Sequence, residues 1–307
     1  MNTDSGEKNL ADYPAPISTI GVLGAGTMGH GIAQMAAVAG FEVFLRDVDE
    51  ASLARGRQAI ERNLAKGVQL GKVSAEERED ALARINTTVE MGDLKAADLI
   101  VEAAPENLDL KQGLLRECES LTAPHCIWAS NTSSLSITEI ARSAIRPQNV
   151  IGMHFFNPVH IMRLVEIVVG GQTSQTTIES VRAVAQRMKK EPIVVRDVPG
   201  FASSRLGVTL GLEAMRMVEQ GVASARDIDT AMELGYNHPM GPLRLTDLVG
   251  LDVRLSIAEY LHSKLGSEAF RPPEILRRMV SQGKLGKKSG EGFYKWNEQE
   301  APQKAYT

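Results

Sequence analysis

Cysteine is scarce in this 307-residue sequence, which contains only Cys118 and Cys126. Two cysteines are too few for a disulfide framework, and their spacing is not that of a metal site, which suits a reducing compartment. The sequence also lacks a long basic run. Together with a net charge of −4, this absence argues against nucleic acid as a partner.

Long apolar runs are absent as well. No segment approaches the roughly 20 apolar residues that a membrane span needs, and residues 1–16 are polar, without a signal-peptide core. We therefore expect a soluble, cytoplasmic protein with no membrane partner. The apolar share (43%) and charged share (23%) are ordinary for a globular protein, and 307 residues exceed the usual size of one domain.

The first two thirds of the sequence predict an α/β fold. A strand over 17–23, a helix over 27–39 and a strand over 41–47 form the βαβ unit of a parallel sheet. Further helices are predicted over 50–70, 74–84 and 108–121, and further strands over 85–89, 97–102, 127–129, 150–154 and 164–169. Alternation of this kind predicts a doubly wound, Rossmann-type, mostly parallel sheet.

The pattern changes at Pro199-Gly200, after which apolar residues recur at helical spacing. One helix is expected on Leu206, Leu210, Met217 and Val218, and another on Leu248, Leu251, Leu255 and Ala258. We predict a Rossmann domain over 1–199 and a smaller all-helical domain over 200–307. A domain this small often completes its core by association, so we expect a homodimer through the helical domain.

The glycine-rich run 24–29 predicts a dinucleotide-binding turn and consists of Gly24, Ala25, Gly26, Thr27, Met28 and Gly29. Three glycines alone are a weak signal, but here a strand precedes them, a helix follows, and Asp47 ends the next strand. Gly24 permits the tight turn, Gly26 lets the backbone approach the pyrophosphate, and Gly29 allows close packing of helix on strand. The helix N-terminus offers N–H groups to the phosphates. A glycine turn without a ligand is the alternative.

Asp47 determines which dinucleotide we expect. Its carboxylate can accept hydrogen bonds from the adenosine ribose hydroxyls and would repel a 2′-phosphate, which favours NAD over NADP. Arg46 could hold such a phosphate, but alternation along the strand directs its side chain to the opposite face. The predicted cofactor is therefore NAD.

His154 is the strongest candidate base among six histidines, since alcohol oxidation needs a base with a pKa near neutral. It closes an apolar strand, and ligand sites in parallel sheets lie beyond the carboxyl ends of strands. Glu166 lies in another apolar strand, where a carboxylate is costly to bury unless it is paired, and pairing with His154 would orient the imidazole. A satisfied core histidine and a glutamate at the solvent edge are the alternatives, and the spacing leaves them open.

Ser133 belongs to the segment 131–134, which follows another short strand. Its hydroxyl could bind a substrate oxygen. Helix capping by Ser133, Ser134 or Ser136 is the alternative, and both can hold for different serines. Because no cluster of His, Cys and carboxylate residues has metal-ligand spacing, we expect no metal.

Seven ordered motifs resemble those of the L-3-hydroxyacyl-CoA dehydrogenase family in its short bacterial, 3-hydroxybutyryl-CoA type. They are GVLGAGTMGHGIA (21–33), VEAAPEN (101–107), SNTSSL (130–135), HFFNPVHIMRLVEIV (154–168), VPGF (198–201), HPMGPLRLTDLVGLD (238–252) and GKLGKKSGEGFYKW (283–296). The resemblance covers nearly the whole chain. It implies reversible oxidation of a (3S)-3-hydroxyacyl-CoA, with 3-hydroxybutyryl-CoA as the expected short-chain substrate, to the 3-oxoacyl-CoA with NAD.

The resemblance also implies roles for individual residues. His154 matches the family's catalytic base and Glu166 the carboxylate that holds it. Ser133 matches the serine that binds the substrate's C3 oxygen beside the cofactor, and Asn157 an asparagine near the reacting centre.

Further matches concern the cofactor, since Glu106 and Lys111 correspond to residues that line its site and Asp47 to the acid that binds its ribose. One position departs from the family pattern. Ser204 precedes Arg205 where the family usually has an asparagine, so it offers one donor on a shorter side chain. This change leaves the efficiency and the preferred acyl chain length open.

An acyl-CoA substrate carries a 3′-phosphate, for which Arg62 and Lys66 are candidate cations one turn apart on a helix. A solvated helix face is the alternative for these two residues. Two other functions remain open for the chain as a whole. One is a sugar-acid or carnitine-type 3-hydroxy acid dehydrogenase, which needs no CoA, and the other is a non-catalytic NAD-binding protein.

Overall fold

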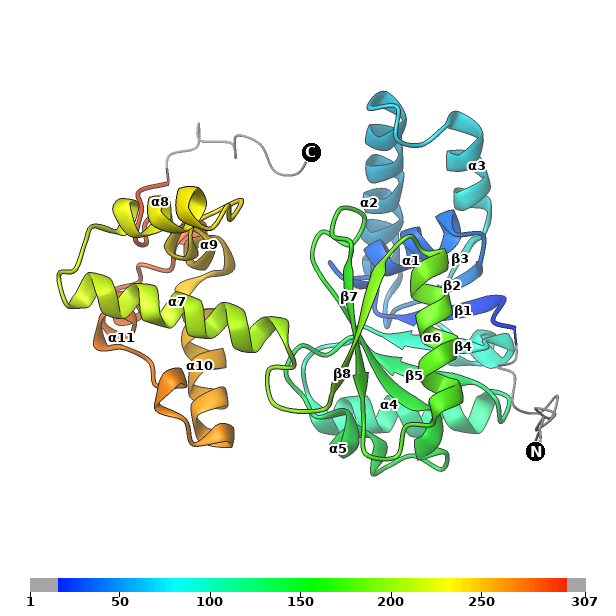
Figure 1. The fold of residues 1–307 in the computed structure, drawn as a ribbon. Coiled ribbons are helices and arrows are strands. Elements are labelled where there is room, and N and C mark those ends of the chain that lie inside the picture. The colour runs from blue at the N-terminus through cyan, green and yellow to red at the C-terminus, as the bar shows by residue number, and fades with distance from the viewer. Residues whose placement is uncertain (1–15, 297–307) are drawn as a thin grey trace, which may run out of the picture. The chain divides into compact units, whose positions relative to one another are not determined.

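The computed structural model describes residues 16–296, whose fold is shown in Figure 1. The chain divides into two compact units, of which the first ends at Val198 and the second begins at Pro199. The outer ends of the two predicted domains, residues 1–15 and 297–307, lie outside the described residues.

Within the described part of the first unit, the strands form one eight-stranded sheet in the order β3-β2-β1-β4-β5-β6-β7-β8. They are β1 (Thr19–Leu23), β2 (Glu42–Arg46), β3 (Ile85–Thr88), β4 (Leu99–Glu102), β5 (Ile127–Ser130), β6 (Val150–Phe155), β7 (Leu164–Val169) and β8 (Glu191–Arg196). Strands β1 to β6 pair parallel, β7 runs antiparallel to β6, and β8 pairs parallel to β7. The prediction of a doubly wound, mostly parallel sheet is confirmed.

Six helices accompany these strands in the described residues: α1 (Gly29–Val38), α2 (Glu50–Gln69), α3 (Ala75–Ala83), α4 (Leu108–Leu121), α5 (Ile137–Ala141) and α6 (Gln175–Arg187). Short 3₁₀ turns occupy Met91–Ala96 and Pro147–Asn149. Several helices begin at side-chain caps that the sequence places there. The Asp49 carboxylate accepts from Ser52 N at the start of α2, and Ser74 forms a capping box with Glu77 at α3.

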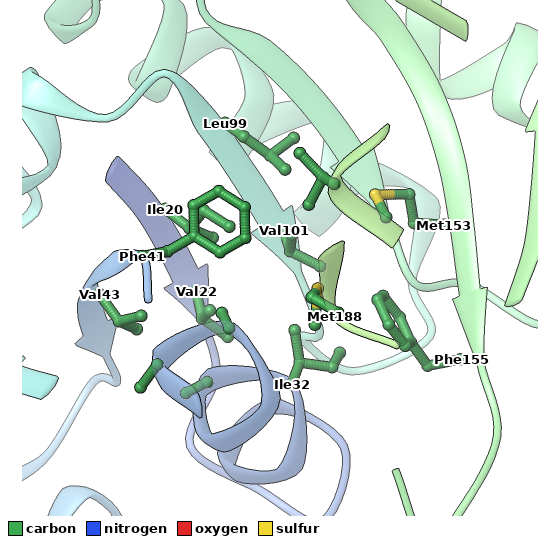
Figure 2. Packing of buried hydrophobic residues seen from close by; sticks show 14 of the residues in the cluster. Ile20, Val22, Ile32, Phe41, Val43, Leu99, Val101, Met153, Phe155 and Met188 are labelled. Carbon is green, nitrogen blue, oxygen red and sulfur yellow. The ribbon is translucent and has the colours of Figure 1, made fainter. Parts of the chain in front are cut away.

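The main core lies between the sheet and one layer of helices. Figure 2 shows its side chains pointing toward one another, including Val22 from β1, Ile32 from α1 and Phe155 from β6. Residues of α2 and α6 belong to the same cluster. On the opposite face, a Cβ at Gly152 of β6 would lie 3.0 Å from Ile137 of α5, so helices cover the sheet on both sides.

The sequence prediction missed β8. Four of its six residues are exposed and two are half-buried, and it contains Pro192 between charged ends at Glu191 and Arg196. Proline is tolerated at a sheet edge, where its missing N–H interrupts no ladder. β8 lies at one edge of the sheet, where Ile193 and Val194 remain exposed, and its short apolar run begins at a proline, which locally argues against a strand.

The described part of the second unit is built mainly from helices. They are α7 (Ser203–Glu219), α8 (Ala225–Gly235), α9 (Pro242–Val249), α10 (Leu251–Leu265) and α11 (Glu274–Ser281), with 3₁₀ turns at Glu268–Phe270 and Lys287–Ser289. The prediction of a single helix through Leu248 and Leu251 was wrong. The chain breaks there at Gly250, whose φ of +103° is outside the range that a helix allows, so the four residues fall on α9 and α10.

A buried carboxylate holds the last described segment onto α9. Asp247, fully buried, accepts from the backbone N–H groups of Phe293 and Tyr294, both at 2.9 Å, and from Trp296 Nε1 at 2.8 Å. Burial raises the pKa of Asp247 despite these donors. A Cβ at Gly292 would lie 2.2 Å from this carboxylate, so the glycine is required for the close approach.

Both cysteines are buried and free, and burial raises the pKa of the Cys118 thiol to about 12 and that of Cys126 to about 11. No helix within residues 16–296 is long and apolar enough to cross a membrane.

Candidate active site

The glycine turn between β1 and α1 is sterically closed on the inside. Gly24 has a φ of +97°, and a Cβ there would lie 2.8 Å from Ala103 O. A Cβ at Gly29 would lie 1.6 Å from Gly24 O, so α1 packs directly on the end of β1. Gly26, by contrast, is exposed, and a Cβ there would have no heavy atom within 4 Å. The outer side of the turn is therefore open to a phosphate-bearing ligand.

Asp47 lies beside this turn. Its Oδ2 accepts from Ala25 N at 2.6 Å and its Oδ1 from Val48 N at 2.7 Å, so the carboxylate is fixed at the end of β2. Arg46 lies elsewhere, with its Nε donating to Val89 O at 3.2 Å. A cavity of about 290 Å³ adjoins the turn, with Asp47 and Gly26 in its lining together with Arg55, Gly56 and Ala59. These residues fit the adenosine half of a dinucleotide.

His154 and Glu166 face each other across the antiparallel pair β6 and β7. His154 Nδ1 is 2.8 Å from Glu166 Oε2, and the carboxylate is fully buried. The pairing that the spacing left open is therefore present, and Glu166 is not at a solvent edge. An ionised carboxylate can only accept a hydrogen bond, so the proton of this contact belongs to His154 Nδ1. In the neutral imidazole the lone pair is then on Nε2. The imidazole ring also contacts Phe156, with centroids 4.5 Å apart.

The segment that carries Ser133 follows β5 and is held by hydrogen bonds to Glu106. Glu106 Oε1 accepts from Thr132 Oγ1 at 2.5 Å and from the backbone N–H groups of Ser133 at 3.1 Å and Ser134 at 3.2 Å. Burial opposes ionisation of Glu106, but the hydrogen bond from Thr132 and the charge of Lys111 outweigh it and lower its pKa. Ser133 itself is exposed.

Helix capping belongs to a different serine. Ser136 Oγ accepts from Glu139 N at 3.1 Å at the start of α5. One of the two alternatives for this segment is thus realised at Ser136.

Lys111 of α4 is nearly inaccessible, with 1% of its side chain exposed. Its ammonium donates to Glu102 Oε1 at 2.6 Å and to Ala104 O at 3.1 Å, and lies 3.4 Å from Glu106 Oε2. It therefore lies behind the loop that joins β4 to α4.

Other predicted residues are distributed over both units. Asn157 is exposed in the turn after β6 and precedes Pro158 through a cis peptide bond. Arg62 and Lys66 are exposed on α2. Ser204 is half-buried on the first turn of α7, in the second unit.

Parallel pairing brings most of the predicted residues to one edge of the sheet. Gly24, Asp47, Glu106 and Ser133 all follow the carboxyl ends of parallel strands, and His154 lies near the end of β6. A direct link joins two of these segments, because Asn131 Oδ1 accepts from Phe155 N at 2.9 Å. Within residues 16–296, no group of three or more His, Cys, Asp or Glu side chains is placed to hold a metal ion.

The sequence analysis missed two polar residues at this edge, Glu102 and Ser130, which are both fully buried. Glu102 ends an apolar strand, and a lysine follows nine residues later in a helix, as the ion pair with Lys111 requires. This spacing could have indicated the ion pair, but the local sequence does not show that either side chain is buried.

Comparison with known proteins agrees with this arrangement. Residues 19–198 match the model of the 3-hydroxyacyl-CoA dehydrogenase NAD binding domain, and residues 200–296 match that of the 3-hydroxyacyl-CoA dehydrogenase C-terminal domain. The chain belongs to the 3-hydroxyacyl-CoA dehydrogenase family. The first unit is thus the NAD-binding domain of this family.

Individual relatives cover almost the whole chain. A probable 3-hydroxybutyryl-CoA dehydrogenase of Deinococcus radiodurans is 46% identical over 276 residues, which are 90% of this chain and 99% of the relative. The mitochondrial hydroxyacyl-coenzyme A dehydrogenase of Homo sapiens is 42% identical over 91% of each chain. The crystal structure of (S)-3-hydroxybutyryl-CoA dehydrogenase from Ralstonia eutropha matches with a TM-score of 0.90 and 42% identity, over 92% of this chain and 100% of that one.

Replacing Asp47 should weaken the preference for NAD. We expect Asp47→Asn to raise the KM for NAD roughly tenfold, since a hydrogen bond to a charged group contributes about 1.5–3 kcal/mol. Turnover with NADP should rise, because the repulsion of a 2′-phosphate is lost. Initial rates with NAD and with NADP give the ratio of the two activities.

Asp49→Asn is the matched control, because it removes the same charge two residues away and asparagine caps a helix equally well. An equal change of the NADP/NAD ratio in both variants would contradict the role of Asp47.

Proposed function

We propose that this protein catalyses the reversible, NAD-dependent oxidation of (3S)-3-hydroxyacyl-CoA to 3-oxoacyl-CoA, with short chains such as 3-hydroxybutyryl-CoA preferred. The single observation that carries the proposal is the buried His154–Glu166 pair, at the sheet edge that also bears the glycine turn. The substrate class follows from the names of the relatives, and the hydride acceptor from the family to which the NAD-binding domain belongs.

In the proposed reaction, His154 Nε2 takes the proton of the substrate's C3 hydroxyl. Nδ1 keeps its proton toward Glu166, whose negative charge stabilises the imidazolium that forms. Ser133 Oγ donates a hydrogen bond to the C3 oxygen and so holds it near the imidazole. Bound NAD supplies the acceptor for the hydride that leaves C3.

Further residues support binding and orientation in this proposal. Glu106 and the turn residues Thr27 and Met28 border the cofactor, Lys111 supports Glu106 from inside the protein, and Asn157 lies close to the reacting centre. The exposed cations Arg62 and Lys66 on α2 bind the CoA 3′-phosphate.

The second unit exposes several large apolar side chains, among them Leu206, Leu234 and Tyr236. Exposed apolar surface of this kind supports a homodimer through the helical domain, which light scattering on the purified protein would test. Two free, buried cysteines favour a reducing cytoplasm as its location.

A substrate panel with a His154 variant tests the function. We expect NADH formation with 3-hydroxybutyryl-CoA and much less with free 3-hydroxy acids of sugar-acid or carnitine type. His154→Gln should lower kcat by a factor of about 10² to 10⁴, the usual contribution of a positioned base. The absorbance of NADH measures both the substrate preference and the kcat of the variant.

His125→Gln is the control. His125 is an exposed histidine whose Nε2 lies 3.3 Å from Asp98, and both residues precede the amino ends of their strands, away from the carboxyl ends where His154 lies. Faster turnover of free hydroxy acids would establish the alternative substrate class. Full activity of His154→Gln would contradict the assigned base.

Charge reversal on α2 tests the CoA contact. Lys66→Glu should raise the KM for 3-hydroxybutyryl-CoA several-fold, since attraction to the 3′-phosphate becomes repulsion. The same variant should leave the KM unchanged for the 3′-dephospho thioester. Lys95→Glu, an exposed lysine elsewhere in the first unit, is the control. A KM for the full substrate equal to that of the unmodified protein would assign Arg62 and Lys66 to a solvated helix face.

Ser204→Asn restores the residue that the family usually has before Arg205. An asparagine reaches farther and offers two donors instead of one, so we expect a higher kcat/KM and a changed preference among acyl chain lengths. Kinetics on acyl-CoA substrates of increasing length measure this effect. Identical profiles before and after the substitution would mean that position 204 does not orient substrate.

A further inference from the structure

Glu102 is a fully buried carboxylate at the end of β4, and the proposed reaction gives it no role. Its Oε1 accepts from Lys111 Nζ at 2.6 Å and from Ala104 N at 2.7 Å. Its Oε2 accepts from Ser130 Oγ at 2.6 Å, on the register partner in β5. Three donors thus satisfy a charge that has no access to water.

Lys111 connects the Glu102 carboxylate to Glu106, which contacts the segment of Ser133. Its ammonium is closer to Glu102, at 2.6 Å, than to Glu106, at 3.4 Å. Glu106 in turn holds the N–H groups of Ser133 and Ser134 through its other oxygen. One buried cation is therefore shared by two carboxylates, and of these two only the Glu106 carboxylate accepts from the N–H groups of Ser133 and Ser134.

We propose that Glu102 is a positioning residue for Ser133. By neutralising Lys111, its charge prevents the buried ammonium from drawing Glu106 away from the segment 132–134. Ser130 reinforces this arrangement from β5, where its Oγ also lies 3.3 Å from Thr132 N as an acceptor. The kinetic part of this inference rests on the proposed function, whereas the structural part does not.

The test uses Glu102→Gln, which keeps the shape of the side chain and removes its charge. Lys111 then has only Glu106 as a counter-charge, so the amide of Ser133 should lose its acceptor and the amide of Ser134 one of its two acceptors. Hydrogen exchange of the peptide covering 130–136 in the cofactor-free protein should become about tenfold faster.

A double-mutant cycle with Ser133→Ala measures whether the effect passes through Ser133. In the Ser133 background, Glu102→Gln should lower kcat for 3-hydroxybutyryl-CoA about tenfold. In the Ser133→Ala background it should lower kcat less than twofold, because coupled residues are not additive. If the unmodified protein fails to oxidise this substrate, the proposed function fails, while the exchange experiment still tests the positioning.

Glu119→Gln is the matched control. Glu119 is another buried carboxylate on α4, and it accepts from Ile145 N at 2.7 Å and Arg146 N at 2.9 Å, away from the Ser133 segment. It should lower the melting temperature without changing exchange over 130–136 or kcat. Additive kcat losses in the cycle, or unchanged exchange in Glu102→Gln, would overturn the proposal.

Ser130→Ala serves if Glu102→Gln does not fold, because it removes the hydrogen bond to Glu102 Oε2 and the weaker one from Thr132 N and leaves all three charges. It should show a smaller loss of kcat that again disappears in the Ser133→Ala background. Equal losses in both backgrounds would overturn the proposal in the same way.

Discussion

Parallel pairing of β2, β1, β4, β5 and β6 is the constraint on which the rest of the site depends. Parallel strands end at the same edge, so residues far apart in sequence meet there. The glycine turn, Asp47, Glu106 and Ser133 each follow one of these strands directly. None of them is carried by a long loop. Gly24 and Asp47 are placed by backbone hydrogen bonds to Arg46 O and Thr88 O, and Ser133 is held by the Glu106 carboxylate.

The reversal of direction at β7 determines which residue lies opposite His154. An antiparallel neighbour places Glu166 directly opposite His154, inside the sheet and away from water. A carboxylate there is costly unless it is paired, and the imidazole is its partner. The same pairing fixes the ring and determines which nitrogen faces the carboxylate, so the energetic requirement of burial and the chemical requirement of a base are met by one contact.

Charge compensation inside the protein is the second recurring device. Glu102 and Lys111 are both buried at the end of β4, and breaking such a pair by removing one partner typically costs 3–5 kcal/mol. In the second unit, Asp247 meets the same problem differently, with three N–H donors and a raised pKa instead of a cation. The ion pair of Glu102 leaves the charge of Lys111 near Glu106, whereas the hydrogen bonds of Asp247 hold the segment 293–296 in place.

Local sequence determined much of this protein. The glycine turn, a helix cap among Ser133, Ser134 and Ser136, most strands and the candidate residues His154 and Glu166 were identified because turn chemistry, periodicity and short motifs depend on neighbours in sequence. Only the tertiary structure decided the antiparallel course of β7, the edge strand β8, the break at Gly250 and the burial of Glu102 with Lys111. Strand direction and the burial of a charge depend on what packs against a segment, and no local pattern records that.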